Sequence, residues 1–460
     1  MATTGTLPPG STAPRWAQGA YALSMPQRGM RRLRDRYGDT FTVDVPIFGR
    51  SVVISEPAEV KQLFQAGTDD VDNLERNLGR VLGPGSLFAR EGEDHRRQRK
   101  LLVPPFHGRR LAAYERIVEE ETVREMAGWP QGRAFATLPS MMRITLNVIL
   151  RAVFGAEGAE FAELRALLPR MVTLGSRLAV LPVPPRGRFS PWRRFRAMRR
   201  EYDAIVGRLI SAAERDGALD ERDDILAMLV QSRYDDGSAM GRGELADQLI
   251  TLLTAGHETT ATTLAWAVER LRRHPAVLHD LVAEADAGGS ALREAALLEV
   301  QRTRPVIDIV GRQVKADGVT LGRWTLPKGY TVLVSIVLMH DDDRNFPDAR
   351  AFDPSRFLGS KPDLYQWVPF GGGSRRCLGA AFATMEMNVV VRTLLRDFVL
   401  APTDERDERW HSRGVASAPA KGGRAVVHRR AHRAAPSTAA PAAAQSRTPA
   451  TSPTDPTEAG

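Results

Sequence analysis

Residues 368–382 read VPFGGGSRRCLGAAF and contain Cys377, the single cysteine of the 460-residue chain. One cysteine cannot form an intramolecular disulfide or complete a four-thiolate metal site. Three roles remain for it: a buried inert thiol, a nucleophile, or one thiolate ligand to a cofactor that brings its other ligands. An inert core thiol is the commonest role of a lone cysteine, so the choice depends on the residues around it.

The neighbours of Cys377 favour the third role. Glycines 371–373 can adopt backbone conformations that let the chain pass close to a flat cofactor, and Gly379 opens a small-residue helix. The helix N-terminus, with Arg375 and Arg376, is expected to lower the pKa of the thiol. The stretch resembles the heme-binding loop of the cytochrome P-450 superfamily, the heme-thiolate monooxygenases, because the pattern F-x-x-G-x-R-x-C-x-G is met in full by Phe370, Gly373, Arg375, Cys377 and Gly379.

Residues 243–273 predict a helix of about 45 Å whose middle breaks the pattern of a buried helix. Gly256 is less favourable there than alanine by about 1 kcal/mol, and Glu258 stands between apolar flanks. At this place the superfamily has the pattern [AG]-G-x-[DE]-T. Ala255, Gly256, Glu258 and Thr259 match its four defined positions. The Thr259 hydroxyl can bond back to the Ala255 carbonyl and open a groove. The resemblance assigns Glu258 and Thr259 to proton delivery to dioxygen.

Glu299 and Arg302 lie three residues apart and share one helix face. Taken alone, they predict an exposed ion pair worth a few tenths of a kcal/mol. The superfamily, however, has Glu-x-x-Arg at this distance before the cysteine, completed by the arginine of a later FxPxRF segment, here Arg356. The resemblance therefore assigns the three residues to a structural network that holds the cysteine loop.

Residues 93–106 read EDHRRQRKLLVPPF, a basic cluster that on its own suggests a nucleic-acid-binding or solvent-facing helix. His95 and Arg99 share one face and can bind a common anion such as the heme propionates. By resemblance, Arg312 and Arg375 occupy further propionate-binding positions. The remaining cations of these motifs are expected to face solvent or an acidic redox partner: Arg96, Arg97, Lys100 and Arg376.

The fold class expected is mainly α with minor β. Alternating residues 41–54 predict a hairpin, helical patterns dominate residues 94–274, and residues 306–339 are β-rich. The resemblance implies the cytochrome P-450 fold, with a long central helix over the heme and small β-rich regions. We expect a flexible N-terminal arm over residues 1–20, one cytochrome P-450 domain over residues 21–433, and a disordered Pro/Ala/Ser/Thr tail over residues 434–460.

Composition bounds the partners only loosely. The net charge of +9 favours acidic partners without naming their class. The first twenty residues contain no apolar run long enough for a signal peptide or a membrane span, so we expect a cytoplasmic protein without a transmembrane segment.

The resemblance covers residues 7–430 and implies a monooxygenase with heme b (iron protoporphyrin IX) bound through Cys377. Such an enzyme inserts one oxygen atom of O2 into a lipophilic small molecule. No flavin or iron–sulfur motif is present, so a separate ferredoxin and an NAD(P)H-dependent ferredoxin reductase are implied. We expect three residues near the substrate pocket: Leu87, Phe88 and Leu178.

Three alternatives remain open. A thiol hydrolase would use Cys377 as nucleophile and one of the nine histidines as base. A nucleic-acid-binding protein would account for the basic cluster but leaves the polar residues 256–260 unexplained, so no nucleic acid is expected as partner. A heme-thiolate peroxygenase or isomerase could share the fold, although such proteins tend to lack the acid–threonine pair.

Overall fold

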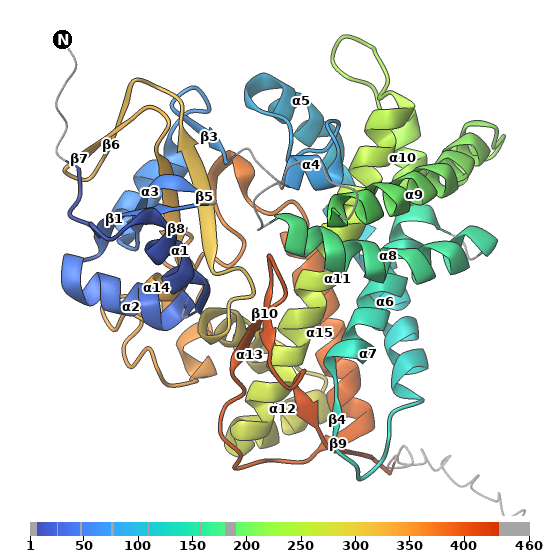
Figure 1. Cartoon of the computed structure of the whole chain (residues 1–460). Coiled ribbons are helices and arrows are strands. Elements are labelled where there is room, and N and C mark those ends of the chain that lie inside the picture. The colour runs from blue at the N-terminus through green and yellow to red at the C-terminus, as the bar shows by residue number, and fades with distance from the viewer. Residues whose placement is uncertain are drawn as a thin grey trace, which may run out of the picture.

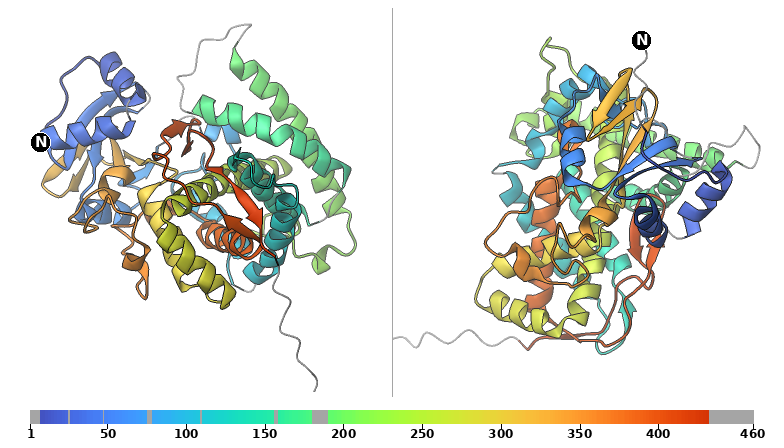
Figure 2. Two further views of the ribbon diagram at one scale, coloured as in Figure 1. Left: turned by 90° about the horizontal axis from the view of Figure 1, so that it is seen from below. Right: turned by 90° about the vertical axis from the view of Figure 1, so that its left-hand side faces the viewer.

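The structure is a computed structural model that describes residues 7–24, 26–46, 48–74, 78–108, 110–155, 158–179 and 190–431. A β-rich part built around one five-stranded sheet lies beside a larger helical part (Figure 1). The left view of Figure 2 shows the same division from below. The fold is mainly helical with a smaller β portion, which confirms the expected class.

The helical part is organised around α11 (Arg242–Arg273), a helix of 32 residues. At 1.5 Å per residue it is about 48 Å long, in agreement with the helix expected over residues 243–273. Most of its side chains are buried, and the fully buried Trp266 donates Nε1 to the Ser417 carbonyl at 2.9 Å. It packs against α7 (Leu138–Phe154) and α15 (Ala380–Asp397). A helix that is buried on nearly every side forms part of the core.

The other helices surround α11 or cover the sheet. They are α1 (Arg15–Ser24), α2 (Pro26–Tyr37), α3 (Pro57–Gln65), α4 (Leu78–Leu82), α5 (Gly92–Leu102), α6 (Arg110–Met126), α8 (Ala159–Ala179), α9 (Pro191–Glu214), α10 (Ile225–Gln231), α12 (Pro275–Asp286), α13 (Ala291–Thr303) and α14 (Ile336–His340). Proline occupies the first turn of α7, α9 and α12, where its missing N–H breaks no helical bond. Among the helices of the described residues, none is both long and apolar enough to cross a membrane.

The main sheet has the strand order β1-β2-β8-β5-β3. Its strands are β1 (Thr40–Val45), β2 (Gly49–Ile54), β3 (Val71–Asn73), β5 (Ile309–Val314) and β8 (Thr331–Ser335). The hairpin predicted over residues 41–54 is confirmed, since β1 and β2 pair antiparallel from Thr40 with Ile54 to Val45 with Gly49. Strand β8 adds parallel to β2 and antiparallel to β5. The sheet therefore joins the N-terminal segment to the chain that follows α13.

The β-rich prediction for residues 306–339 is wrong at its C-terminal end. Strands β5 and β8 and the separate hairpin of β6 (Gly318–Leu321) and β7 (Trp324–Pro327) agree with it. Residues Ile336–His340, however, form the helix α14, and the Ser335 side chain caps that helix by accepting the Leu338 amide. A serine N-cap at the end of a strand starts a helix here despite the β propensity of the isoleucine and valine that follow.

The described part of the predicted flexible arm, residues 7–20, is packed against β1. Two backbone hydrogen bonds join this segment to Thr42 of β1. The Thr42 amide donates to the Pro9 carbonyl at 2.8 Å, and the Thr42 carbonyl accepts the Ser11 amide at 3.1 Å. Gln18 of α1 is buried and accepts the Asp44 amide at 3.0 Å. Backbone pairing and burial therefore hold these residues against β1, and the flexibility of the arm stays a prediction. The predicted tail, residues 434–460, lies outside the described residues.

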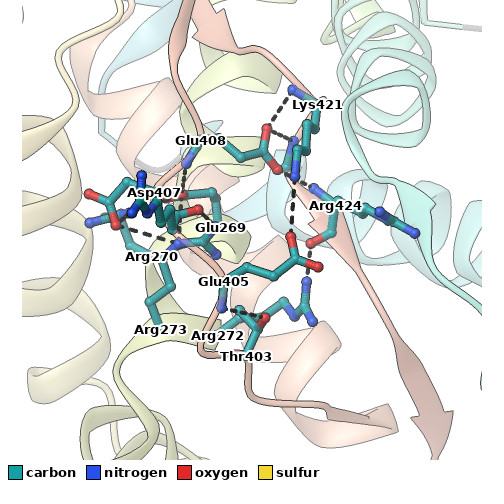
Figure 3. A network of polar contacts seen from close by, with 12 residues as sticks. Glu269, Arg270, Arg272, Arg273, Thr403, Glu405, Asp407, Glu408, Lys421 and Arg424 are labelled. Carbon is teal, nitrogen blue, oxygen red and sulfur yellow. Dashed lines mark hydrogen bonds and ion pairs between the residues drawn. The ribbon is translucent and has the colours of Figure 1, made fainter.

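The C-terminal segment returns to α11. Its short strands are β9 (Phe398–Leu400), β10 (Trp410–Ser412), β11 (Ser417–Pro419), β12 (Arg424–Ala425) and β13 (Val427–Arg429). Strand β12 pairs with β4 (Phe135–Ala136). A polar network fixes this segment to the C-terminal end of α11 (Figure 3). At its centre the buried Glu269 accepts the Glu408 amide at 2.9 Å and pairs with Arg270, which also pairs with Asp407 at 2.7 Å. Breaking a buried pair leaves an uncompensated charge, so the network keeps this segment on α11.

Candidate functional site: the cysteine loop and the middle of α11

Backbone contacts fix the cysteine loop. The Cys377 amide donates to the Phe370 carbonyl at 2.9 Å, and the 3-10 turn Gly373–Arg375 lies between them. Gly379 is the N-cap of α15. The Cys377 side chain is exposed to the space beside the loop. The thiol is thus presented by a fixed loop and is not packed as an inert core residue.

Two of the three loop glycines serve a contact that the sequence did not indicate. Gly373 has a φ of 65°, a conformation that favours glycine, and a Cβ there would collide with the backbone of Phe64. A Cβ at Gly372 would collide with the Phe64 ring. These glycines let the loop pack against α3, and their expected role beside a flat cofactor stays a prediction. Gly379, in contrast, has no atom within 4 Å of its Cβ position.

The expected lowering of the thiol pKa is wrong for the protein without a metal. Desolvation of the thiol by the surrounding protein raises the pKa of Cys377. The Gly379 amide and the guanidinium groups of Arg99 and Arg376 lower the pKa by less. Because a thiolate ligand must be deprotonated, metal binding at Cys377 has to displace this proton.

The middle of α11 faces open space, although the helix runs through the core. Ala255 is exposed and Thr259 is half-buried, whereas most of the helix is buried. The Thr259 hydroxyl donates to the Ala255 carbonyl at 2.7 Å, which confirms the expected bond. Gly256 instead faces α7, where a Cβ would lie 3.4 Å from Ile149 Cδ1. A Cβ at Gly256 would make only an ordinary van der Waals contact with α7, so the packing of the two helices does not require glycine here. The open stretch belongs to Ala255 and Thr259.

Glu258 is buried, with 6% of its surface exposed. Its Oε1 accepts a hydrogen bond from Arg413 Nε at 2.8 Å. Arg413 lies 155 residues further along the chain, in the turn between β10 and β11. No local sequence pattern pairs residues so far apart, so the sequence alone did not indicate Arg413.

A second acid lies on another side of α11. Glu386 of α15 is fully buried and lies near Thr260. Burial raises the pKa of Glu386 well above its usual value, and the Thr260 hydroxyl offsets this only in part. Its position nine residues after Cys377 did not reveal this buried acid.

Basic groups gather beside the cysteine loop. His95 is 1% exposed, and its Nδ1 has no hydrogen-bond partner in the part of the chain that the structure describes. Burial, together with the charges of Arg375 and Arg99, lowers the pKa of His95 to about 3. Burial and the charge of Arg375 lower the pKa of Arg312 to about 10. Arg99 and Arg312 are cations partly removed from water and favour an added anion, and the neutral ring of His95 can donate a hydrogen bond. These residues therefore fit a cofactor with carboxylates, as heme has.

Arg99 and Arg312 also contact the loop itself. Arg99 donates from its guanidinium to the Arg376 carbonyl at 2.8 Å. Arg312 donates to the Gly372 carbonyl at 3.1 Å. The two arginines come from α5 and β5 and contact the cysteine loop at both ends of its 3-10 turn. The predicted propionate ligands His95, Arg99 and Arg312 therefore lie at one site.

Arg375 has protein partners for most of its donors, and its expected contact with a heme carboxylate stays a prediction. It pairs with the buried Asp72 at 2.5 Å and donates to the carbonyls of Leu87 and Arg90. Burial opposes ionisation of Asp72, but the Gly92 amide and Arg375 outweigh it, and the pKa of Asp72 is lowered. Asp72 is 303 residues from Arg375, and no sequence pattern indicated the pair. Arg375 thus joins β3 to the cysteine loop.

The three-residue network has the predicted geometry. Glu299 and Arg302 are buried and share two hydrogen bonds of 2.6 Å, and Arg356 Nε lies 3.4 Å from Glu299 Oε1. The Arg302 guanidinium also donates to the carbonyls of His340, Ala349 and Ala351. A buried pair with this many bonds is the arrangement in which loss of one partner is strongly destabilising.

His340 links the network to the loop. Burial and the charge of Arg302 lower its pKa to about 3, so the ring is neutral. Its Nδ1 lies 3.1 Å from the Arg302 carbonyl and its Nε2 accepts the Val368 amide at 3.2 Å. Since Val368 starts the segment that contains Cys377, the network reaches the cysteine loop through a histidine that the sequence did not single out.

The predicted pocket residues fall in different surroundings. Leu87 is half-buried and packs on the main core, Phe88 is 38% exposed, and Leu178 is 1% exposed within that core. Leu178 belongs to one apolar cluster and Leu87 packs against it, and their place near the substrate stays a prediction.

The basic side chains of α5 have intramolecular partners. Arg96 pairs with Glu93 at 2.6 Å, Arg97 with Asp236 at 2.6 Å and Lys100 with Asp235 at 2.7 Å. Part of the charge expected for an acidic partner is thus balanced within the chain. In the described residues the exposed Arg376 side chain forms no such pair.

Comparisons with known proteins agree with this geometry. The family model for cytochrome P450 matches residues 8–423. A putative cytochrome P450 138 of Mycobacterium tuberculosis is 53% identical over 426 residues, 92% of this chain and 97% of that protein. A putative cytochrome P450 135B1 of the same species is 40% identical over 434 residues, 92% and 91% of the two chains.

A solved structure described as retinoic acid bound cyanobacterial CYP120A1 has a TM-score of 0.82, 24% identity, and coverage of 93% of this chain and 100% of that chain. This likeness shows the fold. The family match over nearly the whole chain shows the enzyme class and its cofactor, heme. The chain therefore belongs to the cytochrome P450 family of heme-dependent monooxygenases.

Proposed function

We propose that this protein inserts one oxygen atom of dioxygen into a lipophilic small molecule and reduces the other atom to water, and that Cys377 would hold heme b as its thiolate ligand. When bound, the heme supplies the activation of dioxygen. The observation that carries the proposal is the open stretch in the middle of α11. There the Thr259 hydroxyl is bonded to the Ala255 carbonyl beside the acid Glu258, and a hydroxyl and an acid are the groups that proton delivery requires.

The other residues of the site would bind the heme or hold the cysteine loop in place. We assign the carboxylates of the heme to His95, Arg99 and Arg312, because these groups meet beside the cysteine loop with excess positive charge. Arg375 fixes the loop through Asp72. Ala255 and Gly379 leave space beside the cofactor, while Phe370 closes the loop through its carbonyl.

Peroxygenase or isomerase chemistry remains the second candidate, because it would use the same fold and the same cysteine ligand. The acid–threonine pair favours the monooxygenase, since a reaction without external electrons and dioxygen has no need of a proton relay on this helix.

Labelled dioxygen tests the proposed reaction. The purified heme protein, given a surrogate ferredoxin, its reductase and NAD(P)H, should convert a lipophilic compound from a binding screen into a product that carries one 18O atom from 18O2. Product without label, or equal product formation from hydrogen peroxide without the reductase, would contradict the monooxygenase assignment in favour of the second candidate.

We propose an acidic ferredoxin and an NAD(P)H-dependent reductase as the electron source and the cytoplasm as the place of action. The basic surface made by Arg96, Arg97, Lys100 and Arg376 supports the acidic partner. Because the first three are already ion-paired, we expect Arg376 to contribute most.

Charge reversal separates these contributions. Arg376→Glu should slow reduction by an acidic ferredoxin more than Arg97→Glu does, because the Arg97 guanidinium is already engaged by Asp236, whereas Arg376 has no such pair among the described residues. Added salt should slow the parent protein. Stopped-flow reduction rates at two ionic strengths measure both effects. Arg32→Glu on α2 is the matched control, since Arg32 is exposed on the β-rich part. Equal rates for the Arg376 and Arg32 variants would place the docking surface elsewhere.

A further inference from the structure

The hairpin of β10 and β11 lies along α11 and contacts it at three levels. At its base, the network of Figure 3 connects Glu269 and Arg270 to the chain just before β10. Further along, the Trp266 indole donates to the Ser417 carbonyl of β11. At its tip, Arg413 reaches Glu258. These contacts span three turns of α11, so the position of the tip depends on the whole hairpin.

The tip has a defined backbone conformation. The Arg413 amide donates to the Ala416 carbonyl at 2.9 Å and closes the turn. Gly414 has a φ of 114°, and a Cβ there would collide with the backbone of Ser176 on α8. The Val415 amide donates to Ser176 Oγ at 3.0 Å. The side chain of Arg413 therefore starts from a backbone that α8 and the hairpin both restrain.

Arg413 brings its charge to one point of α11. Its side chain is 29% exposed and Glu258 is 7% exposed, with 2.8 Å between Nε and Oε1. The charge of Arg413 also acts on the neighbouring His257. Burial, and to a smaller extent Arg413, lowers the pKa of His257 to about 4. Glu258 Oε2 has no hydrogen bond to a described residue, so one carboxylate oxygen is held and the other is left for water.

We propose that Arg413 is a positioning residue for Glu258: it holds the carboxylate in the orientation from which Glu258 relays protons toward Thr259. This inference rests on the proposed function, in which Glu258 belongs to the relay. A carboxylate with a buried charge needs a partner, and the described residues offer Glu258 no other cation. Without Arg413 the side chain would lose both its orientation and its counter-charge.

The test compares Arg413→Gln with Arg413→Lys and with a control in the same segment. Arg413→Gln should retain heme and the consumption of NAD(P)H, while product per NAD(P)H falls roughly tenfold, as for residues that orient a functional ligand. The solvent deuterium isotope effect on product formation should rise, because proton delivery becomes slower. Arg413→Lys keeps the charge and should recover part of the loss. Arg409→Gln removes an exposed charge that is not paired with Glu258 and should change nothing.

A double-mutant cycle shows whether Arg413 acts through Glu258. In a Glu258→Gln background, Arg413→Gln should change the coupling of NAD(P)H to product by less than about twofold. The four proteins of the cycle are the parent, the two single variants and the double variant. Their thermal unfolding midpoints, with and without heme, should show coupling between the two sites, because only the single variant Arg413→Gln leaves an unpaired buried carboxylate. If Arg413→Gln proves too unstable to purify, Ser176→Ala, which removes the contact to Val415, should cause a smaller loss of product in the same direction.

Two results would overturn the inference. One is parent-like coupling in Arg413→Gln or, if that protein cannot be purified, in both Arg413→Lys and Ser176→Ala. The other is a full loss on adding Arg413→Gln to Glu258→Gln, which would show that Arg413 acts independently of Glu258. Failure of the proposed function is distinct, because the parent protein itself would then yield no product labelled from 18O2.

Discussion

Replacing Cys377 by histidine is expected to abolish the strongly red-shifted Soret band of the reduced carbon monoxide complex. The thiolate donates electron density to the iron and produces this band, whereas neutral imidazole does not. Cys377 is the single thiol of the chain, so no other residue can supply a thiolate. Absorption spectra of the reduced protein with carbon monoxide measure the effect, and total heme is determined separately to distinguish loss of the ligand from loss of the cofactor.

A chemical control uses the parent protein. Cys377 is exposed in the structure, so heme-free protein should react with one equivalent of a thiol reagent and heme-bound protein should be protected. Because burial raises the pKa of this thiol, the reaction should accelerate as the pH rises toward that pKa. A red-shifted band that persists in Cys377→His, or a thiol that reacts equally with and without heme, would contradict the axial assignment.

Replacing Thr259 by alanine is expected to uncouple the reaction while leaving heme and substrate binding intact. The hydroxyl at this position can fix a water molecule and stabilise oxygen during protonation, and a methyl group cannot. Product per NAD(P)H should fall by roughly ten- to a hundredfold, toward the lower end of what a positioned proton-transfer group contributes. Hydrogen peroxide should rise correspondingly. The stoichiometry of NAD(P)H, peroxide and product measures the change.

Thr263 provides the matched control for Thr259. Its hydroxyl makes the same type of bond one turn later, to the Thr259 carbonyl at 3.1 Å, but Thr263 is buried. Thr263→Ala therefore removes an equivalent helix bond without changing the open stretch, and its coupling should match the parent. Unchanged coupling in Thr259→Ala would transfer the role to another residue, and the buried Thr260 near Glu386 is then the next candidate.

The residues that identify the family could be read from the sequence because they lie close together in it. The cysteine motif occupies ten positions, the α11 motif five and Glu-x-x-Arg four. Each of these patterns is set by one turn or one helix face. The bond from Thr259 to Ala255 and the pair of Glu299 with Arg302 were predictable for the same reason, and the structure has both.

The length of α11 and the β1–β2 hairpin also followed from local periodicity. By itself, then, the sequence determined the class, the family resemblance and the thiol that can bind iron.

Tertiary structure decided what depends on distant segments. Asp72 meets Arg375 across 303 residues and Arg413 meets Glu258 across 155 residues, and no periodic pattern encodes either pair. The sequence alone also could not give the direction of the Cys377 pKa shift. Burial outweighs the nearby charges, and burial is a property of the packed chain. Likewise the role of Gly373 depended on Phe64, which only the folded protein brings beside it. Contacts of this kind arise from how elements pack, and packing is not encoded in any one segment.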